Sequence, residues 1–234
     1  MQRVYQVSDV GAVRENNEDS LAVFAPEIYA VADGMGGHAG GEVASRLAVQ
    51  TLKGQLGAIP LGEAELRRAI LAANGAILEM ARSHREYEGM GTTLTLLHLE
   101  AGMAYWAHVG DSRLYLFRDG VLRQITRDHS LVEDLIEKGS ITREEARVHP
   151  QRNMITRAVG TDEKVVVDTG KLALCHGDSL LLCSDGLTSA ATDEEIQNVL
   201  TEDHREDKAE ALVEHALALG SQDNISVIVV CYEA

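Results

Sequence analysis

The segment VADGMGGHAGG, Val31 to Gly41, places an Asp directly after an apolar run and follows it with five glycines in eight residues. Such a run predicts a buried strand, and a carboxylate at the end of a buried strand costs free energy unless a positive group meets it. Two later apolar runs adjoin an acid in a similar way. LLLCSDG contains Asp185, and Asp223 stands shortly before the apolar ISVIVV. Three such acids predict a shared cation.

Two further acids occupy comparable positions between β-like runs, Asp19 in NNED and Asp111 in VGDSRLY. None of the five acids has a His or Cys at a ligand spacing, so the donors favour a hard ion such as Mg²⁺ or Mn²⁺ over zinc. An Asp before Gly is often only a turn residue. That alternative does not explain why so many acids adjoin runs that should be buried.

A pair of such ions would share a water, lower its pKa and hold it for in-line attack on a phosphorus or carbonyl centre, which predicts a hydrolase. Arg14, in VRENNED, offers the planar fork that grips two phosphate oxygens. A solvated surface position is the alternative for Arg14, because most arginines are exposed.

Length and composition predict one domain with a sizeable core, since the chain has 234 residues and 45% hydrophobic content. Its 21 Lys and Arg against 37 Asp and Glu give a net charge of −16, which disfavours nucleic acid and anionic membranes as partners. The odd set Cys175, Cys183 and Cys231 contains no C-x-x-C pair, and each lies in or beside an apolar stretch. Buried thiols and a cytoplasmic location are therefore expected, with no leader or membrane span.

Strand-like and helix-like runs arrive in blocks rather than in βαβ alternation, which favours packed antiparallel sheets with helices on their outer faces. Asp119-Gly120 is typical of a two-residue hairpin turn. The expected strands are 4–7, 20–24, 28–32, 92–99, 103–108, 113–118, 121–124, 165–167, 180–183 and 225–232. The expected helices are 43–56, 66–80, 131–138, 142–149, 193–200 and 207–219.

Eight segments, in order and across nearly the whole chain, resemble the metal-dependent serine/threonine phosphatases of the type-2C class in a compact bacterial form. They are VRENNED, VADGMGGHAGGEVAS, GTTLTLL, AHVGDSRLYL, ITRDHSLV, ITRAVG, LLLCSDGL and SQDNISVIVV. The resemblance implies an α+β fold, a four-layer αββα sandwich with two central antiparallel β-sheets flanked by antiparallel helices. It also implies one catalytic domain over residues 1–234, with a flap insertion at about 128–160.

The same resemblance implies hydrolysis of phosphoserine and phosphothreonine in proteins by a metal-bridged water, without a phosphoenzyme, in opposition to Ser/Thr kinases. The cofactors would be two Mg²⁺ or Mn²⁺ ions, with a third ion held more weakly. The partners would be phosphorylated proteins, with a cognate kinase among the candidates, and a monomer is expected. The implied roles are a bridging ligand at Asp33, a carbonyl ligand at Gly34, ligands of the other ion at Asp185 and Asp223, a holder of bound waters at Asp19, a third-ion ligand at Asp111 and a phosphate-binding side chain at Arg14.

The chain departs from eukaryotic relatives at Met35, where they carry a His proposed as the acid for the leaving group. His38 is a candidate substitute, and a helix-start or packing role is its alternative. Bacterial members share this Met. Within the flap, His129, His149 and Arg152 are weak candidates for substrate contact, with solvated surface as the alternative for each.

Three other functions compete with this interpretation. Gly34 to Ala39 formally matches a dinucleotide-binding G-x-G-x-x-A, but no suitable acid follows about twenty residues on. A cysteine-based phosphatase would need an Arg six positions after its Cys, where Cys175 and Cys183 have Leu181 and Ser189. A pseudophosphatase that only binds phosphoproteins would normally have lost a metal ligand, and here every core Asp is present.

Overall fold

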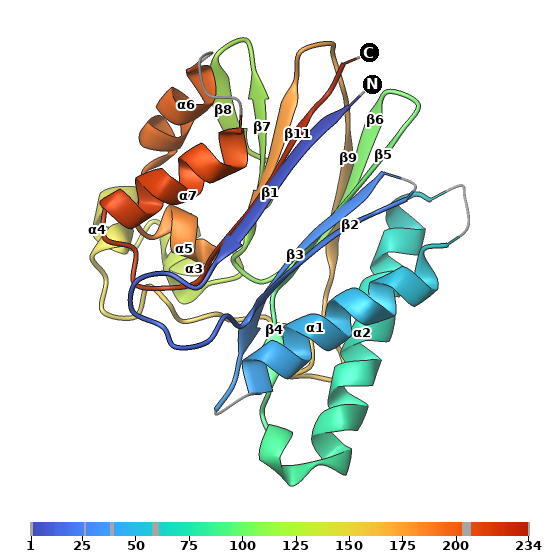
Figure 1. The fold of residues 1–234 in the computed structure, drawn as a ribbon. Coiled ribbons are helices and arrows are strands. Elements are labelled where there is room, and N and C mark those ends of the chain that lie inside the picture. Colours follow the sequence, from blue (N-terminus) through green and yellow to red (C-terminus); the bar gives the residue numbers. More distant parts are fainter. Residues whose placement is uncertain (1, 26, 38–39, 58–60, 203–206, 234) are drawn as a thin grey trace.

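The computed structural model describes residues 2–25, 27–37, 40–57, 61–202 and 207–233. Two β-sheets face each other, and a pair of helices covers the outer face of each (Figure 1). This four-layer arrangement confirms the predicted αββα sandwich. None of the described helices is long and apolar enough to span a membrane.

The first sheet has five antiparallel strands, and its inner strand β11 is apolar on both faces because both are covered. The turn between its last two strands has positive φ at both Asp119 and Gly120, which confirms the predicted hairpin. In spatial order the strands are β1 (Arg3–Asp9), β11 (Ile225–Cys231), β10 (Ser179–Cys183), β7 (Arg113–Arg118) and β8 (Val121–Gln124).

The second sheet has six strands and is also antiparallel. Its main path runs through β2 (Asp19–Phe24), β3 (Ile28–Met35), β5 (Leu94–Glu100), β6 (Met103–Val109) and β9 (Asp168–Ala173), and β4 (Gly91–Thr92) pairs with the end of β3. Helices α1 (Gly40–Gln55) and α2 (Glu63–Ser83) pack on its outer face through apolar positions such as Leu52, Leu66 and Ile70.

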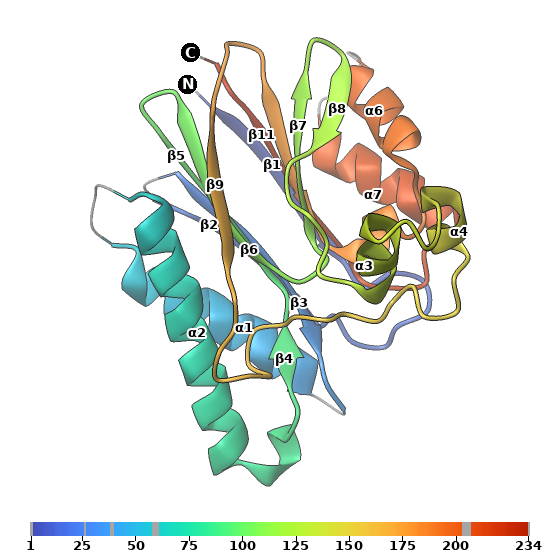
Figure 2. The same ribbon diagram turned by 180° about the vertical axis from the view of Figure 1, so that it is seen from behind.

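Alternation along the strands divides the core into layers. Val31 and Leu97 of the second sheet meet Leu182 and Ile228 of the first between the sheets. The other face of the first sheet packs on α6 (Asp193–Thr201) and α7 (Lys208–Ala218). Short helices α3 (Leu131–Glu137) and α4 (Arg143–Arg147) lie beside the sandwich (Figure 2). The one-turn helices are η1 (Arg85–Tyr87) and α5 (Asp185–Thr188).

Two expectations about strand limits were wrong. β3 does not stop at Asp33 but continues to Met35, because β4 pairs with Gly34 and Met35 and extends the sheet. The strand expected at 165–167 begins instead at Asp168. Val165 and Val167 are buried in an irregular segment, so their apolar character reflects packing against α2 and its neighbours rather than a strand.

Candidate active site

The five acids singled out in the sequence lie at one end of the sandwich, the lower end in Figure 1. Antiparallel pairing explains this: Asp19 begins β2 directly opposite Asp33 near the end of β3. In the other sheet β10 ends just before Asp185, and β11 begins just after Asp223. Asp111 lies in the turn between β6 and β7. Strand ends that are distant in sequence therefore converge.

Asp33 is held through its backbone by the two threonines of GTTL. Its N–H donates to Thr93 Oγ1 at 2.9 Å, and its carbonyl accepts from Thr92 Oγ1 at 2.9 Å and from the Thr93 N–H at 2.8 Å. The next residue, Gly34, donates its N–H to the Glu18 carbonyl at 3.1 Å. These bonds fix the Asp33 backbone, so that its carboxylate keeps one direction.

Asp19 and Asp111 are both buried, with 9% and 8% of their surface exposed. Ser184 Oγ donates to Asp19 Oδ2 at 2.7 Å and accepts from the Ser226 N–H at 2.9 Å. Asp111 Oδ1 has no hydrogen-bond partner among the described residues. A buried carboxylate oxygen without a partner is costly, and a bound cation would satisfy it.

Electrostatics show that the five carboxylates share one region. Burial raises the pKa of Asp33 well above its usual range, and the charges of the other four acids raise it further. Burial raises the pKa of Asp19 to about 7, and burial together with the Asp223 charge raises that of Asp185 to about 6. The pKa of Asp111 is also raised, by burial and then by Asp185. Each acid disfavours ionisation of the others, which is the condition a cation relieves.

Arg14 lies at the edge of this cluster, half exposed, and its NH2 group bonds Asp223 Oδ2 at 2.7 Å. The loop that carries Arg14 is tied to the start of β11 by Asn224. The side-chain NH2 of Asn224 donates to the Val10 and Asn16 carbonyls at 2.9 and 3.0 Å, and its side-chain Oδ1 accepts from the Glu18 N–H at 2.8 Å. This arrangement leaves the rest of the Arg14 fork beside the acids.

The donors suit a hard divalent ion, because they are carboxylates and backbone carbonyls that repel one another when the cation is missing. Among the described residues, no three His, Cys, Asp or Glu side chains are gathered closely enough to hold a metal ion as they stand. The raised pKa values and the unpartnered Asp111 oxygen support this fit.

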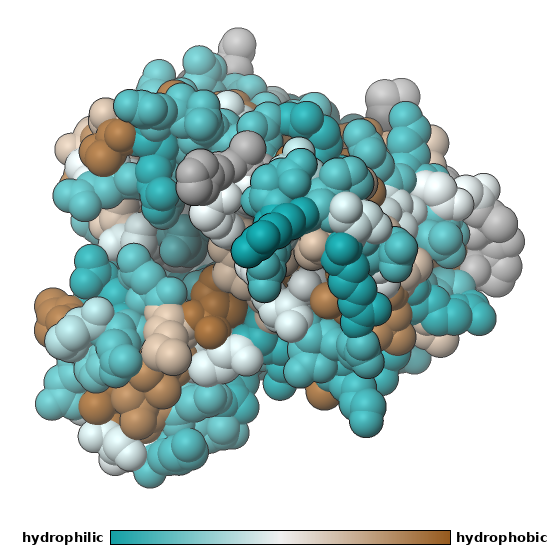
Figure 3. Space-filling view, turned by 90° about the horizontal axis from the view of Figure 1, so that it is seen from below, coloured by the Kyte–Doolittle hydropathy of each residue, from teal (hydrophilic) through white to brown (hydrophobic). Residues whose placement is uncertain are grey.

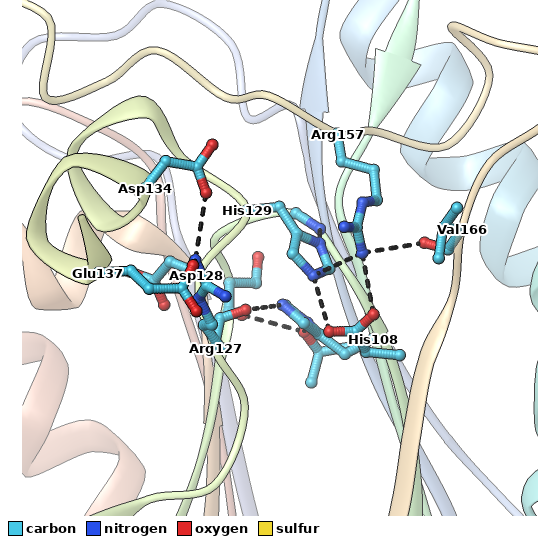
Figure 4. A network of polar contacts seen from close by, with 12 residues as sticks. His108, Arg127, Asp128, His129, Asp134, Glu137, Arg157 and Val166 are labelled. Carbon is cyan, nitrogen blue, oxygen red and sulfur yellow. Dashed lines mark hydrogen bonds and ion pairs between the residues drawn. The ribbon is translucent and has the colours of Figure 1, made fainter.

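The three flap candidates lie in different environments. His129 is not a solvated residue: it is 5% exposed, its Nδ1 accepts from the Gly110 N–H at 3.0 Å, and its Nε2 lies 3.1 Å from Asp168 Oδ2 (Figure 4). Arg157 joins the same network through Asp168 Oδ1 at 2.9 Å (Figure 4). His149 is half-buried and accepts from the Gln151 N–H at 3.1 Å.

Arg152 is exposed and lines a cavity that also reaches Asp111 and Asp185. Met35 ends β3. His38 lies outside the described residues.

Sequence reasoning missed the polar residues that support the acids. Thr93, Ser184 and Asn224 are buried and bind either an acid or its backbone. For Ser184 and Asn224 a signal was available, because each directly adjoins one of the five acids, whereas Thr93 lies in GTTLTLL, far along the chain from all of them. A hydroxyl or amide at such a position needs a buried partner.

The structure argues against two of the competing functions. The sheet that contains β3 is antiparallel, so the glycine run does not open the βαβ unit that a dinucleotide site requires. Of the three thiols expected to be buried, Cys183 is buried, Cys231 is half-buried and Cys175 is exposed, so the expectation was wrong for Cys175. Burial raises the pKa of the Cys183 thiol to about 12, which removes the thiolate needed for a nucleophile there, and Cys175 has Leu181 in place of an Arg six positions on.

Comparison with known proteins agrees with the site. The family model for protein phosphatase 2C matches residues 12–219. The serine/threonine phosphatase stp of Listeria monocytogenes is 41% identical, with 95% of this chain and 93% of the relative aligned. The serine/threonine protein phosphatase PstP of Mycobacterium tuberculosis is 45% identical over 95% of this chain, which spans 43% of that longer protein.

Among solved structures, the catalytic domain of PstP in complex with two manganese ions superposes with a TM-score of 0.91 at 40% identity, covering 100% of this chain and 99% of that one. Sequence, fold and the cluster of buried carboxylates agree, and the chain belongs to the protein phosphatase 2C family of metal-dependent serine/threonine protein phosphatases.

Proposed function

We propose that this chain hydrolyses phosphoserine and phosphothreonine in proteins with two Mg²⁺ or Mn²⁺ ions held by the acid cluster. The observation that carries the proposal is the convergence of the acids at one end of the sandwich, with a buried Asp111 oxygen that has no partner among the described residues. The raised pKa values of Asp19, Asp33, Asp111 and Asp185 support it, because bound cations would relieve the burial and mutual repulsion that raise them. The manganese ions of the PstP structure support the same assignment.

Within this proposal each acid has a distinct role. Asp33 would hold both ions, with the Gly34 carbonyl as a ligand of one and Asp185 and Asp223 as ligands of the other. Asp19, fixed by Ser184, orients bound waters. Asp111 belongs to a third, weaker ion, in agreement with its unpartnered oxygen.

When bound, the ions supply a water of lowered pKa as nucleophile for in-line attack and neutralise charge on the phosphoryl oxygens. Arg14 binds two phosphoryl oxygens with the part of its fork that Asp223 leaves free, and so orients phosphorus. Cys183 is too basic and too deeply buried to form a phosphoenzyme, which favours direct attack.

The test is phosphate release from p-nitrophenyl phosphate and from a phosphothreonine peptide, measured against Mn²⁺ and Mg²⁺ concentration. Turnover that depends on the metal, and disappears in Asp33→Ala, Asp185→Ala and Asp223→Ala variants that retain the wild-type circular dichroism, supports the proposal. Binding of phosphopeptide without turnover at any metal concentration would favour a pseudophosphatase instead.

We further propose that residues 1–234 form one catalytic domain with a flap at about 128–160, acting as a cytoplasmic monomer against a Ser/Thr kinase. The antiparallel pairing of β1 with β11 supports one unit, because it joins residues from the two ends of the chain. Sedimentation velocity would test the monomer. Phosphoproteomic comparison of cells with and without the protein would test the opposition to a kinase, which predicts phosphosites that accumulate in its absence.

A further inference from the structure

A cavity of about 390 Å³ adjoins the active site and shares Asp111 and Asp185 with it. One wall is the segment of α3 and α4, and the other is α5 with the start of α6. The view from below shows a hollow on its left, the side on which α3 and α4 lie (Figure 3). A substrate whose phosphate reaches the acids therefore passes beside this cavity.

The α3–α4 wall is anchored where it leaves and rejoins the core. Arg113 grips Asp128 with Nε at 3.0 Å and NH2 at 2.7 Å, and Gln124 also donates to Asp128 at 2.8 Å. The His129 ring accepts from the Gly110 N–H, and the His129 backbone N–H donates to the Gly110 carbonyl at 2.7 Å. The cavity is therefore largely preformed, which lowers the entropic cost of binding there.

Two arginines on this wall have no hydrogen-bond or ion-pair partner among the described residues. Asp128 is already bonded to Arg113, and Glu133 lies 3.5 Å from Arg143. By contrast, the guanidinium groups of Arg147 and Arg152 are exposed and make no hydrogen bond or ion pair with any residue in the described ranges.

Acids on the opposite wall do not neutralise these two arginines. Asp193 accepts from the Tyr115 hydroxyl at 3.0 Å. Glu195 is engaged by Thr192, and the charge of Arg147 is only the smallest influence on its pKa, behind the Thr192 bonds. Glu194 also lines the cavity and opposes anions there. The two guanidinium groups thus face the cavity with their charge largely available.

Such groups are notable in a chain of net charge −16, where most arginines have acids within reach. A guanidinium beside a catalytic pocket attracts and binds carboxylate or phosphate oxygens. Val132, Ile136 and Ala146 add apolar lining, which suits the aliphatic part of an intervening residue.

We propose that this cavity binds the substrate chain next to the phosphorylated residue, and that Arg147 and Arg152 select substrates carrying a second anionic group there. The group is an acidic side chain or a second phosphate. The inference rests on the proposed function, and it names the substrate class which that function leaves open.

The experiment compares phosphothreonine peptides that are identical except for their flanking residues, which are neutral, Glu-containing or carry a second phosphate on either side. Wild-type kcat/KM should be about tenfold higher for the anionic peptides than for the neutral one, mainly through KM. A preference for phosphate alone would identify a multiply phosphorylated segment as the substrate, and an equal preference for Glu would identify an acidic one.

The Arg147→Gln/Arg152→Gln variant should lose this ratio, and Arg147→Glu/Arg152→Glu should invert it in favour of Lys-flanked peptides. The matched control is Arg82→Gln on α2, whose ion-pair partner is Glu163 and which should keep the wild-type ratio. Equal kcat/KM for all peptides, or a preference that survives both double variants, overturns the inference. Absence of turnover even on p-nitrophenyl phosphate overturns the proposed function instead.

Discussion

At the residue scale, the central feature is a set of acids that the fold forces into one poorly solvated region. Asp33 is affected most, since the four other acids all raise its pKa in addition to burial. Among the described residues the opposing positive charges are Arg14, at the edge beside Asp223, and Arg113, which lowers the pKa of Asp111 and Asp185 but is itself bonded to Asp128. Function and stability therefore oppose each other here.

Replacing Asp33 by Asn should lower Mn²⁺-dependent turnover by ~10²-fold or more, because a ligand charge is lost. In chelator at pH 7.5 the same variant should be more stable than wild type by about 1–2 kcal/mol, since one of the mutually repelling acids is gone. Urea unfolding and phosphatase assays measure the two effects. The exposed Glu79→Gln on α2 is the control and should change neither. A metal-free Asp33→Asn protein that is less stable than wild type would contradict this account.

At the element scale, the junction of β3 with α1 depends on one glycine in the opening segment. A Cβ at Gly34 would overlap the carbonyl oxygens of Gly41 and Glu18, because the start of α1 lies directly against the strand. Gly37, three residues later, has nothing within 4 Å of the same position. The glycines of this run thus have different functions.

Gly34→Ala should destabilise the protein by about 1–3 kcal/mol or more, since backbone rather than a side chain would have to move. Gly37→Ala should stay within about 0.5 kcal/mol of wild type. Thermal unfolding of both variants with Mn²⁺ present makes the comparison. Equal unfolding temperatures for the two would show that α1 is not seated on β3 as described.

A second feature at this scale is the start of the α3–α4 segment, where His129 binds the core. His129→Leu would leave the buried Gly110 N–H without its acceptor, at a cost of about 1–3 kcal/mol. Trypsin cleavage after Arg143, Arg147 and Arg152 should then accelerate. The control Arg127→Gln removes only half-exposed pairs with Asp134 and Glu137 and should have little effect. Cleavage at the wild-type rate in His129→Leu would show that His129 does not anchor the segment.

At the scale of the whole molecule, the buried acids and a buried histidine change the free energy of unfolding with pH in opposite directions. The raised pKa values of Asp19, about 7, and Asp185, about 6, mean that the folded protein binds more protons than the unfolded chain above pH ~4. Their stabilising effect is therefore lost as pH rises. Buried His108, with its pKa lowered to about 4, loses stabilising effect as pH falls below ~6.5.

Above pH ~6.5 the rest of the unfolded-state His titration is outweighed by that of the several buried acids in the folded protein. The unfolding temperature in chelator should therefore fall between pH 6.5 and 8, and saturating Mn²⁺ should remove this fall. Calorimetry at fixed ionic strength measures it, and Asp33→Asn should flatten the slope. An unfolding temperature that rises with pH in chelator would contradict the assignment.

The sequence by itself determined the layers and the identity of the acids. Alternating and helical periodicities are local, so the strand 225–232 and the helix 193–200 were predicted to within a residue or two. The acids were visible because a carboxylate beside an apolar run is costly wherever that run packs. Motif order then supplied the family.

Only the tertiary structure decided what depends on contacts between distant residues. The extension of β3 past Asp33 required pairing with β4, and the burial of His129 required Gly110 and Asp168 to converge on it. That Arg147 and Arg152 lack ion-pair partners among the described residues likewise follows only from the folded structure, in which Asp128 pairs with Arg113 and Glu133 lies beside Arg143. The local sequence pattern shows which polar groups need a hydrogen-bond or ion-pair partner. Only the folded chain determines which residue that partner is.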